Sequence, residues 1–184
     1  MKRTIALLFL LAFCSVTAMQ AQVQAPKPGP EVKKLSVYLG HWTYEGESKP
    51  GPWGPGGKFT GERDVRWILR GFYLETRVRE KGPAGESQSI EIDGYDPVNK
   101  TFTWAVYVDN GEMASGVATF SSGTTETYSG KSIGGRKQYL IRGTDVFAPD
   151  LLSFTEKDEA STDGKTWMTV WEYKATKAQP APKK

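Results

Sequence analysis

The sequence has almost none of the residues on which many catalytic and metal sites depend. Its 184 residues include one cysteine, Cys14, and one histidine, His41. One cysteine cannot form a disulfide within the chain, and a single histidine on the first expected strand does not complete a Ser/His/Asp triad. The chain also has no phosphate-binding loop, dinucleotide fingerprint or His-Glu-x-x-His motif. We therefore predict no catalytic residues, no cofactor and no metal site.

The chain also lacks an apolar run long enough to anchor it in a membrane. The run at residues 5–13 is shorter than the roughly 20 residues that a spanning helix needs. It follows two basic residues and precedes small residues at Ala18 and Ala21, which is the pattern of a secretory signal peptide over residues 1–21. We expect cleavage after Ala18 or Ala21, and a secreted or periplasmic protein. The alternatives are a buried N-terminal helix or lipidation at Cys14, although a lipidated cysteine normally follows a small residue.

An excess of charge of one sign is missing as well. The chain has 24 basic and 21 acidic residues, and loss of the leader would leave 22 and 21, a formal charge of +1. Nucleic acids and anionic membranes select a much stronger positive field. We therefore expect no nucleic-acid partner, and no membrane insertion after cleavage of the signal peptide.

Proline and lysine concentrate at the two ends of the remaining chain. Residues 22–30 have the composition of an extended tether, and residues 176–184 that of a disordered tail. Between them lies one domain, residues 31–175, of a size that can be held by a hydrophobic core without disulfides.

The domain begins with one short helix. Glu31 favours the positive end of a helix and Gly40 supplies a stop. Val32, Leu35 and Leu39 fall on one side, so this helix has an apolar stripe that must pack on another element.

Everything after Gly40 has the pattern of strands and turns. Runs rich in β-branched and aromatic residues alternate with Gly, Pro, Asn and Asp, and they number about ten. The expected strands lie near residues 40–47, 57–69, 72–80, 88–95, 101–109, 112–121, 125–132, 136–147, 151–160 and 166–175. Their short connections, such as Asn110-Gly111, exclude parallel crossovers, so the sheet is antiparallel. We predict an up-and-down β-barrel, because closure removes unpaired edges; a two-sheet sandwich is the alternative.

Strand alternation predicts which side chains point into the barrel. Large aromatic residues dominate the expected inner faces, and a barrel of ten strands is wider than one that side chains just fill. A cavity with apolar walls and a few polar groups would bind a small ligand, whereas a fully packed core is the other possibility. The candidate ligand-binding residues are Trp42, Tyr44, Arg63, Trp67, Ile92, Trp104, Tyr139, Phe154 and Trp171.

Two of the candidates have more specific expected roles. Alternation places Arg63 on the same face as Trp67, where its charge must pair with an inward acid such as Glu156, lie in solvent at the mouth, or bind an anionic ligand. Trp53 lies in a loop rich in Pro and Gly between the first two strands. There it either acts as a lid over the mouth or pins the loop to the barrel wall.

Several motifs resemble known families. A short helix followed by Gly40-His41-Trp42 resembles the Gly-x-Trp motif of lipocalin-like (calycin) barrels. The string Asp-Gly-Tyr-Asp-Pro-Val-Asn-Lys-Thr-Phe at 93–102, followed by Trp104, is similar to a bacterial family of unknown function with that fold, over about residues 30–175. Many members end with Tyr-x-Arg, but the last strand here ends Trp-Glu-Tyr-Lys at 171–174, so no matching arginine is expected to pack on Trp42.

The chain also resembles, more distantly, the nitrobindin-like haem barrels. The shared features are ten strands and the pattern Gly-x-Trp-x-x-Glu-Gly at 40–46. Those proteins bind iron through a histidine late in the chain, whereas His41 lies beside the first tryptophan. Alternation turns His41 away from the inner face of its strand, so we expect no haem.

The resulting functional expectation is an exported protein that binds or carries a small apolar or amphipathic molecule. Arg63 or Tyr44 would orient the polar end of that molecule. The alternatives are an enzyme, such as an isomerase or hydrolase of an apolar substrate, which a buried acid with a raised pKa beside the cavity would favour, and an interaction module with a filled barrel. Asp96 is expected to cap a turn, and Asp158 is expected to lie on a solvated edge.

Overall fold

The computed structural model describes residues 26–178. The expected signal peptide, the cysteine considered for lipidation and the last six residues lie outside the described residues. Within the described range, no helix is long and apolar enough to cross a membrane.

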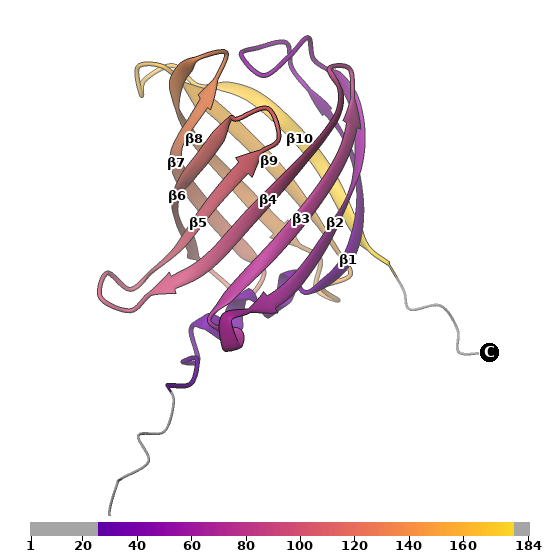
Figure 1. Cartoon of the computed structure of the whole chain (residues 1–184). Coiled ribbons are helices and arrows are strands. Elements are labelled where there is room, and N and C mark those ends of the chain that lie inside the picture. The colour runs from indigo at the N-terminus through magenta and orange to yellow at the C-terminus, as the bar shows by residue number, and fades with distance from the viewer. Residues whose placement is uncertain (1–25, 179–184) are drawn as a thin grey trace, which may run out of the picture.

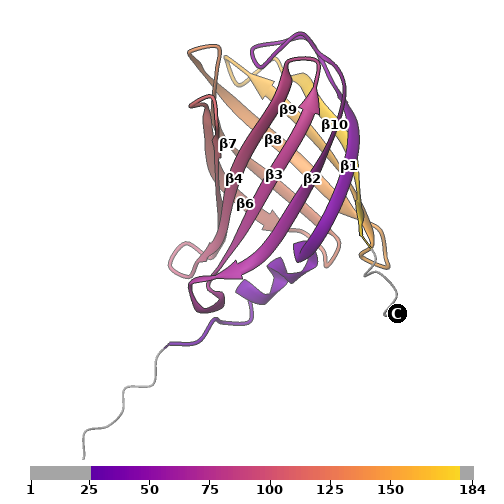
Figure 2. The same cartoon turned by 45° about the vertical axis from the view of Figure 1, so that its right-hand side comes forward.

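The described chain forms one closed, ten-stranded antiparallel barrel, as Figures 1 and 2 show from two sides. Each strand pairs with its neighbours in sequence, and β1 closes the barrel by pairing with β10. The strands are β1 Gly40–Ser48, β2 Gly57–Ile68, β3 Tyr73–Gly82, β4 Gly85–Asp96, β5 Thr101–Val108, β6 Met113–Phe120, β7 Thr125–Gly134, β8 Lys137–Phe147, β9 Ser153–Ser161 and β10 Met168–Lys177. The barrel prediction is confirmed, and the two-sheet alternative is wrong. The last strand runs to Lys177, two residues into the expected tail.

The expected helix is present as the 3-10 helix η1, Val32–Tyr38, and it lies across the lower end of the barrel (Figure 2). Val32 and Leu35 of the predicted stripe are buried, together with Tyr38. A second short 3-10 segment, η2 Leu69–Gly71, makes the turn between β2 and β3 at the same end. The lower end is therefore plugged by the chain itself, and the upper end carries the loop between β1 and β2.

The tight turns follow the chemistry of their residues. At the predicted Asn110-Gly111 hairpin, Gly111 adopts a φ of 86°, and Asn110 Oδ1 accepts a hydrogen bond from the Glu112 amide at 2.8 Å. Between β7 and β8 the turn residues are Gly135 and Arg136, both with positive φ. Gly134 still belongs to β7, where Trp53 packs against its Cα.

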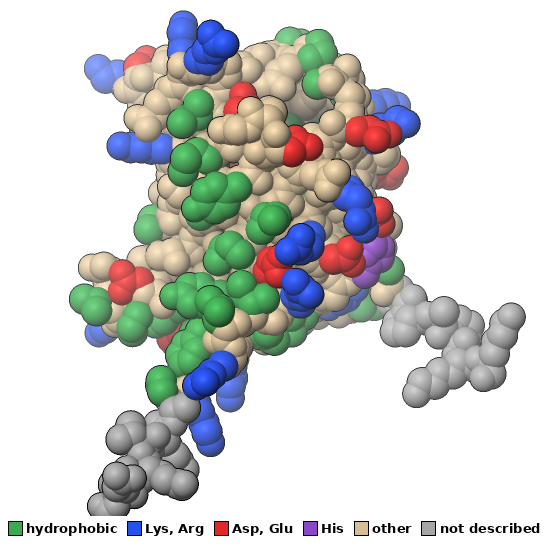
Figure 3. Space-filling model, viewed as in Figure 1, with side chains coloured by type: hydrophobic (Ala, Val, Ile, Leu, Met, Phe, Trp, Pro, Cys, Tyr) green, Lys and Arg blue, Asp and Glu red, His purple; other side chains and the backbone are tan. Residues whose placement is uncertain are grey.

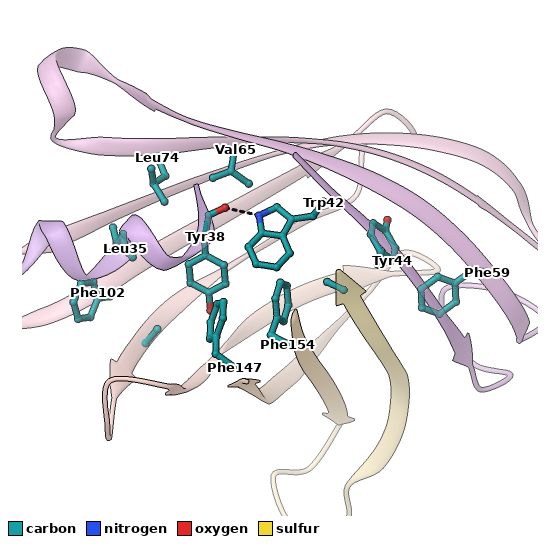
Figure 4. Packing of buried hydrophobic residues seen from close by; sticks show 12 residues of the cluster. Leu35, Tyr38, Trp42, Tyr44, Phe59, Val65, Leu74, Phe102, Phe147 and Phe154 are labelled. Atoms are coloured by element: carbon teal, nitrogen blue, oxygen red, sulfur yellow. Dashed lines mark hydrogen bonds between the residues drawn. The ribbon is translucent and has the colours of Figure 1, made fainter. Parts of the chain in front are cut away.

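An aromatic cluster fills the lower part of the barrel (Figure 4). Trp42 packs edge-on against Phe154 with ring centroids 5.2 Å apart, and its indole N–H donates to the carbonyl of Tyr38 at 2.7 Å. Burial of such rings with their polar atoms satisfied is a major source of stability for a barrel without disulfides. The ammonium group of Lys177 on β10 lies 4.9 Å from the centre of the Trp42 ring and covers this tryptophan.

The outer wall is apolar over β4, β5 and β6 (Figure 3). Ile90, Tyr107 and Val117 are exposed there. Because this wall is apolar on the outside, hydrophobicity alone does not distinguish its inner from its outer face.

Candidate functional site

The barrel encloses a cavity of about 510 Å³ that opens at the upper end. Its floor includes Leu35, Tyr38 and Phe102, and its upper walls include Val106 and Trp171. This volume falls within the range of roughly 300–1,000 Å³ that is typical of small-molecule sites. The possibility of a fully packed barrel is therefore wrong.

Trp53 stands at the mouth of the cavity. Its ring centroid is 5.0 Å from that of Tyr139 on β8 and 5.1 Å from that of Trp171 on β10, so it packs on two aromatic side chains of the barrel wall. The loop that carries it spans the upper end of the barrel in Figure 1. Trp53 and the glycines beside it line the cavity.

Acidic side chains surround the middle and lower part of the cavity. We refer to them as the acidic belt; they are Glu80, Glu91, Asp93, Glu126, Asp145, Glu156 and Asp158. Among the described lining residues the only cations are Arg63, at the level of the belt, and Lys49, in the loop at the mouth. Seven carboxyl groups thus share one buried guanidinium.

The guanidinium of Arg63 is already engaged with the belt. It lies 3.3 Å from Glu91 Oε2 and 3.7 Å from Glu156 Oε2, and it donates to Tyr173 Oη at 2.8 Å. The predicted pairing with Glu156 is confirmed. Its Nε is buried and has no hydrogen-bond partner among the described residues. Two carboxylates hold this cation, so it is a poor anchor for an additional anion.

At the floor, one tyrosine lies between two acids. Tyr38 Oη is 2.5 Å from Glu126 Oε2 and 2.6 Å from Asp145 Oδ2. A phenol has a single proton and can donate to only one of them, so the other carboxyl group must itself carry a proton. Burial is the main cause that raises the pKa of Glu126 to about 7. Burial, followed by repulsion from Glu156, raises the pKa of Asp145 well above its usual range.

The same proton count applies one step further along the same wall, where Tyr128 of β7 follows Glu126 by two residues. Tyr128 Oη contacts Asp158 Oδ1 and lies 3.0 Å from Glu156 Oε1. Burial, followed by repulsion from Glu156, raises the pKa of Asp158 well above its usual range, which favours its protonated form. The expectation that Asp158 lies on a solvated edge is wrong. Gly143 makes this arrangement possible, because a Cβ there would overlap the Tyr128 ring.

Asp93 and Asp96 have different environments although they are close in sequence. Burial, followed by repulsion from Glu91 and Glu126, raises the pKa of Asp93, and none of the described residues pairs with its carboxyl group. Asp96 lies outside the cavity, where its Oδ1 accepts from the Val98 amide at 2.8 Å. The prediction that Asp96 caps a turn is confirmed.

The structure brings only some of the candidate ligand-binding residues together. Tyr44, Arg63, Trp104 and Trp171 line the cavity. Trp42, Trp67 and Phe154 pack in the core at the floor, and Tyr139 packs against Trp53 at the mouth.

Ile92 is the misplaced candidate, because the predicted faces of β4 are reversed. Ile92 is paired with Glu75 and Ala105 on the outer wall. Glu91, one residue earlier, is paired with Thr76 and Val106 and lines the cavity. The apolar residues of this strand belong to the apolar outer wall, and its acids point inward.

The remaining polar motifs form no second site. His41 lies outside the barrel, with Nδ1 2.8 Å from Asp64 Oδ1, in agreement with the expected orientation. The Gly-Lys-Ser-Ile-Gly string at 130–134 has the spacing of a nucleophile elbow, but Ser132 lies within β7 rather than on a turn from a strand to a helix. Within residues 26–178, no group of three or more His, Cys, Asp or Glu side chains is arranged to hold a metal ion.

One solved structure supports this fold. The crystal structure of Rv2717c from M. tuberculosis is similar, with a TM-score of 0.60 and 11% identity over 83% of this chain and 100% of that chain. A fluorescence-activating β-barrel designed de novo gives a TM-score of 0.41 at 10% identity, over 78% of this chain and 95% of that one. No curated protein matches the sequence significantly. A family profile described as "Protein of unknown function (DUF1579)" matches residues 27–174, and the chain therefore belongs to that family.

Proposed function

We propose that the protein is an exported binding or carrier protein of the lipocalin-like type, whose barrel holds a small apolar or amphipathic molecule. The observation that supports this most strongly is the cavity of about 510 Å³, plugged below by η1 and opening beneath Trp53. A cavity of this kind, with apolar walls and a few polar groups, is how small-molecule sites are built. In this proposal the carboxyl groups of the acidic belt, and not Arg63, orient the polar end of the bound molecule.

The interior location is tested by filling the cavity. Val106→Trp on β5 places a large ring in the cavity, and we expect it to weaken binding of the neutral dye Nile red by at least about tenfold, because bound ligand and side chain compete for one volume. Val117→Trp on β6 is the matched control, since Val117 is 46% exposed on the outer wall. Fluorescence titration measures both. Equal affinities in the two variants would place the dye elsewhere and contradict an interior site.

The proposed role of Trp53 as a lid is tested kinetically. Trp53→Ala removes the ring packed on Tyr139 and Trp171, and we expect association and dissociation of the dye to accelerate together by roughly an order of magnitude, with little change in affinity. Trp167→Ala is the control. The Trp167 ring stacks on Arg142, whose Cζ lies 4.1 Å from the ring centroid, and not on Tyr139 and Trp171. Stopped-flow fluorescence gives the rates. Unchanged rates in Trp53→Ala would show that the ring only pins the loop.

The proposed export is tested at the N-terminus. Expression of the full chain in a bacterium, followed by sequencing of the exported protein, should give a mature chain starting after Ala18 or Ala21. Recovery of the intact chain from the cytoplasm alone would overturn this part of the proposal.

A second candidate function is an enzyme that uses a belt acid as general acid or base. The observation favouring it is Glu126, whose pKa is raised to about 7, mainly by burial, where a carboxyl group can both give and take a proton. A panel of apolar esters and ketones, offered to the protein and to Glu126→Gln, tests it. Turnover that is lost in the variant would support catalysis, and no turnover by either protein would leave binding as the function.

A further inference from the structure

We infer that the molecule held in the cavity is an organic cation, an amine with an apolar body, whose charged nitrogen lies among the carboxyl groups of the acidic belt. This inference rests on the proposed binding function and names the class of its ligand. It reverses the polarity expected from the sequence, in which Arg63 would orient an anionic end.

The first support is the imbalance between acidic and basic side chains within the cavity. Arg63 is held by Glu91 and Glu156, and its single positive charge balances one of the seven acids. No other described cation lines the cavity at that depth. An anion entering the cavity would have to displace Glu91 or Glu156 from Arg63 and would raise the pKa of the remaining carboxyl groups further, whereas a cation is stabilised by each carboxyl group that ionises as it binds.

The second support is a buried acceptor atom that lacks a donor. Asp145 is 4% exposed and lines the cavity, and its Oδ1 accepts no hydrogen bond from any described residue. A buried polar atom in this state normally has a partner, since leaving it unpaired costs about 1–3 kcal/mol. Once Asp145 is ionised this oxygen is an acceptor, and an ammonium group supplies the hydrogen-bond donor that it lacks.

The third support is that three of these acids are direct neighbours across adjacent strands. Asp145 on β8 is the direct cross-strand neighbour of Glu126 on β7 and of Glu156 on β9. The Cβ atoms of directly opposed residues in an antiparallel sheet lie about 4.5–5.5 Å apart. An alkylammonium has two or three N–H donors, so it can serve neighbouring carboxyl groups of such a row at once. A metal ion fits less well, because the described residues offer no group of three ligands arranged to hold one.

The cavity walls suit the apolar body of an amine. The lining also includes Val78, Val106 and Ile141, and Trp104 and Tyr128 add aromatic surface at the level of the belt. Buried aromatic rings also attract an ammonium group through their negatively charged faces.

Binding of a cation to the belt depends on pH, because the acids must lose protons to become anions. The titratable and charged groups that face this region are Tyr38 of η1, Tyr44 of β1, Arg63 of β2, Glu80 of β3, Glu91 and Asp93 of β4, Glu126 and Tyr128 of β7, Asp145 of β8, Glu156 and Asp158 of β9, and Tyr173 of β10. A cation favours the ionised carboxylates, so it should bind more tightly as the pH rises and release protons as it binds.

Three probes with the same ring and different charge test the inference on the whole protein in its exported form. They are 1-naphthylmethylamine, 1-naphthylmethanol and 1-naphthoic acid, measured by calorimetry at pH 6 and pH 8. We expect the amine to bind at least about tenfold more tightly than the alcohol at pH 8, with proton release, and a smaller advantage at pH 6. The acid should bind most weakly.

Variants then locate the charged nitrogen. Asp145→Asn should remove most of the advantage of the amine over the alcohol while leaving alcohol binding unchanged, because the ring site is intact. Asp93→Asn gives a second measurement if the first variant folds poorly, and Glu172→Gln, at an exposed position of β10, is the matched control.

The outcomes separate the two proposals. Equal affinity for all three probes, or tightest binding of the acid, would overturn the cation inference and leave the cavity as a binding site. Absence of binding by every probe, with Nile red also excluded, would overturn the proposed function itself.

Discussion

Replacing Arg63 by methionine should destabilise the protein by about 3–5 kcal/mol at pH 8. Arg63 is 8% exposed, and its removal leaves the carboxyl groups of Glu91 and Glu156 buried without a counter-charge. Breaking a buried ion pair by removing one partner typically costs this much, because an uncompensated charge stays buried. Urea unfolding followed by tryptophan fluorescence measures the loss.

The loss should shrink when the pH is lowered to 5, because burial raises the pKa of Glu91 and its protonated form no longer needs the cation. Arg79→Met is the matched control: Arg79 pairs with Glu62 and Asp64 on the outer wall, where its side chain is 63% exposed. Exposed pairs contribute about 0–1 kcal/mol, so this variant should remain close to the wild type at both pH values. Equal losses for the two arginines would contradict the buried position of Arg63.

The free energy of unfolding should fall as the pH rises from about 4.5 through 7. A carboxyl group with a pKa raised by folding is protonated in the folded protein and ionised in the unfolded chain over this window. Its stabilising contribution is therefore complete below the unfolded value and is lost as the pH rises through the folded value. For Glu126 the two values are 4.5 and about 7, and the difference corresponds to about 3 kcal/mol.

Glu126→Gln isolates this contribution. The amide cannot ionise, so the fall in stability between pH 4.5 and 7 should become smaller by about 3 kcal/mol. The part of the fall that comes from Asp145 and Asp158 should persist, because burial also raises the pKa of both groups well above the usual range. Glu172→Gln on the outer wall serves as the control. A stability curve that rises with pH in the wild type, as for a protein with paired surface carboxylates, would contradict the buried belt.

The fold follows from local patterns in the sequence. Turn residues and β-branched runs predicted the bounds of all ten strands to within three residues at each end. This worked because hairpins are determined by residues adjacent in the chain. Alternation placed Trp42, Arg63 and Trp104 on the inner face for the same reason: once a strand is located, the direction of each side chain has a period of two.

The site was harder to predict because, along part of the barrel wall, polar side chains face the interior and apolar side chains face outward. On β4 the isoleucines face outward and the acids face inward, which is the opposite of the usual assumption that apolar residues are buried. One signal was present in β9: Glu156 and Asp158 are two and four residues after the inward Phe154, so alternation places both inside. The hydrogen bonds of Tyr38 and Tyr128 to acids on distant strands have no local signature, because they depend on how η1 and the strands meet in space.

The most direct test of a sheltered, acid-lined interior is a titration of the individual Asp and Glu carboxyl carbons by NMR between pH 3 and pH 10. We predict one group of exposed acids that titrates in the ordinary range, Glu126 with a midpoint of about 7, and Asp93, Asp145 and Asp158 still protonated above that range. If all carboxyl groups instead titrate together near pH 4, water reaches the interior freely and the acids do not form a buried belt.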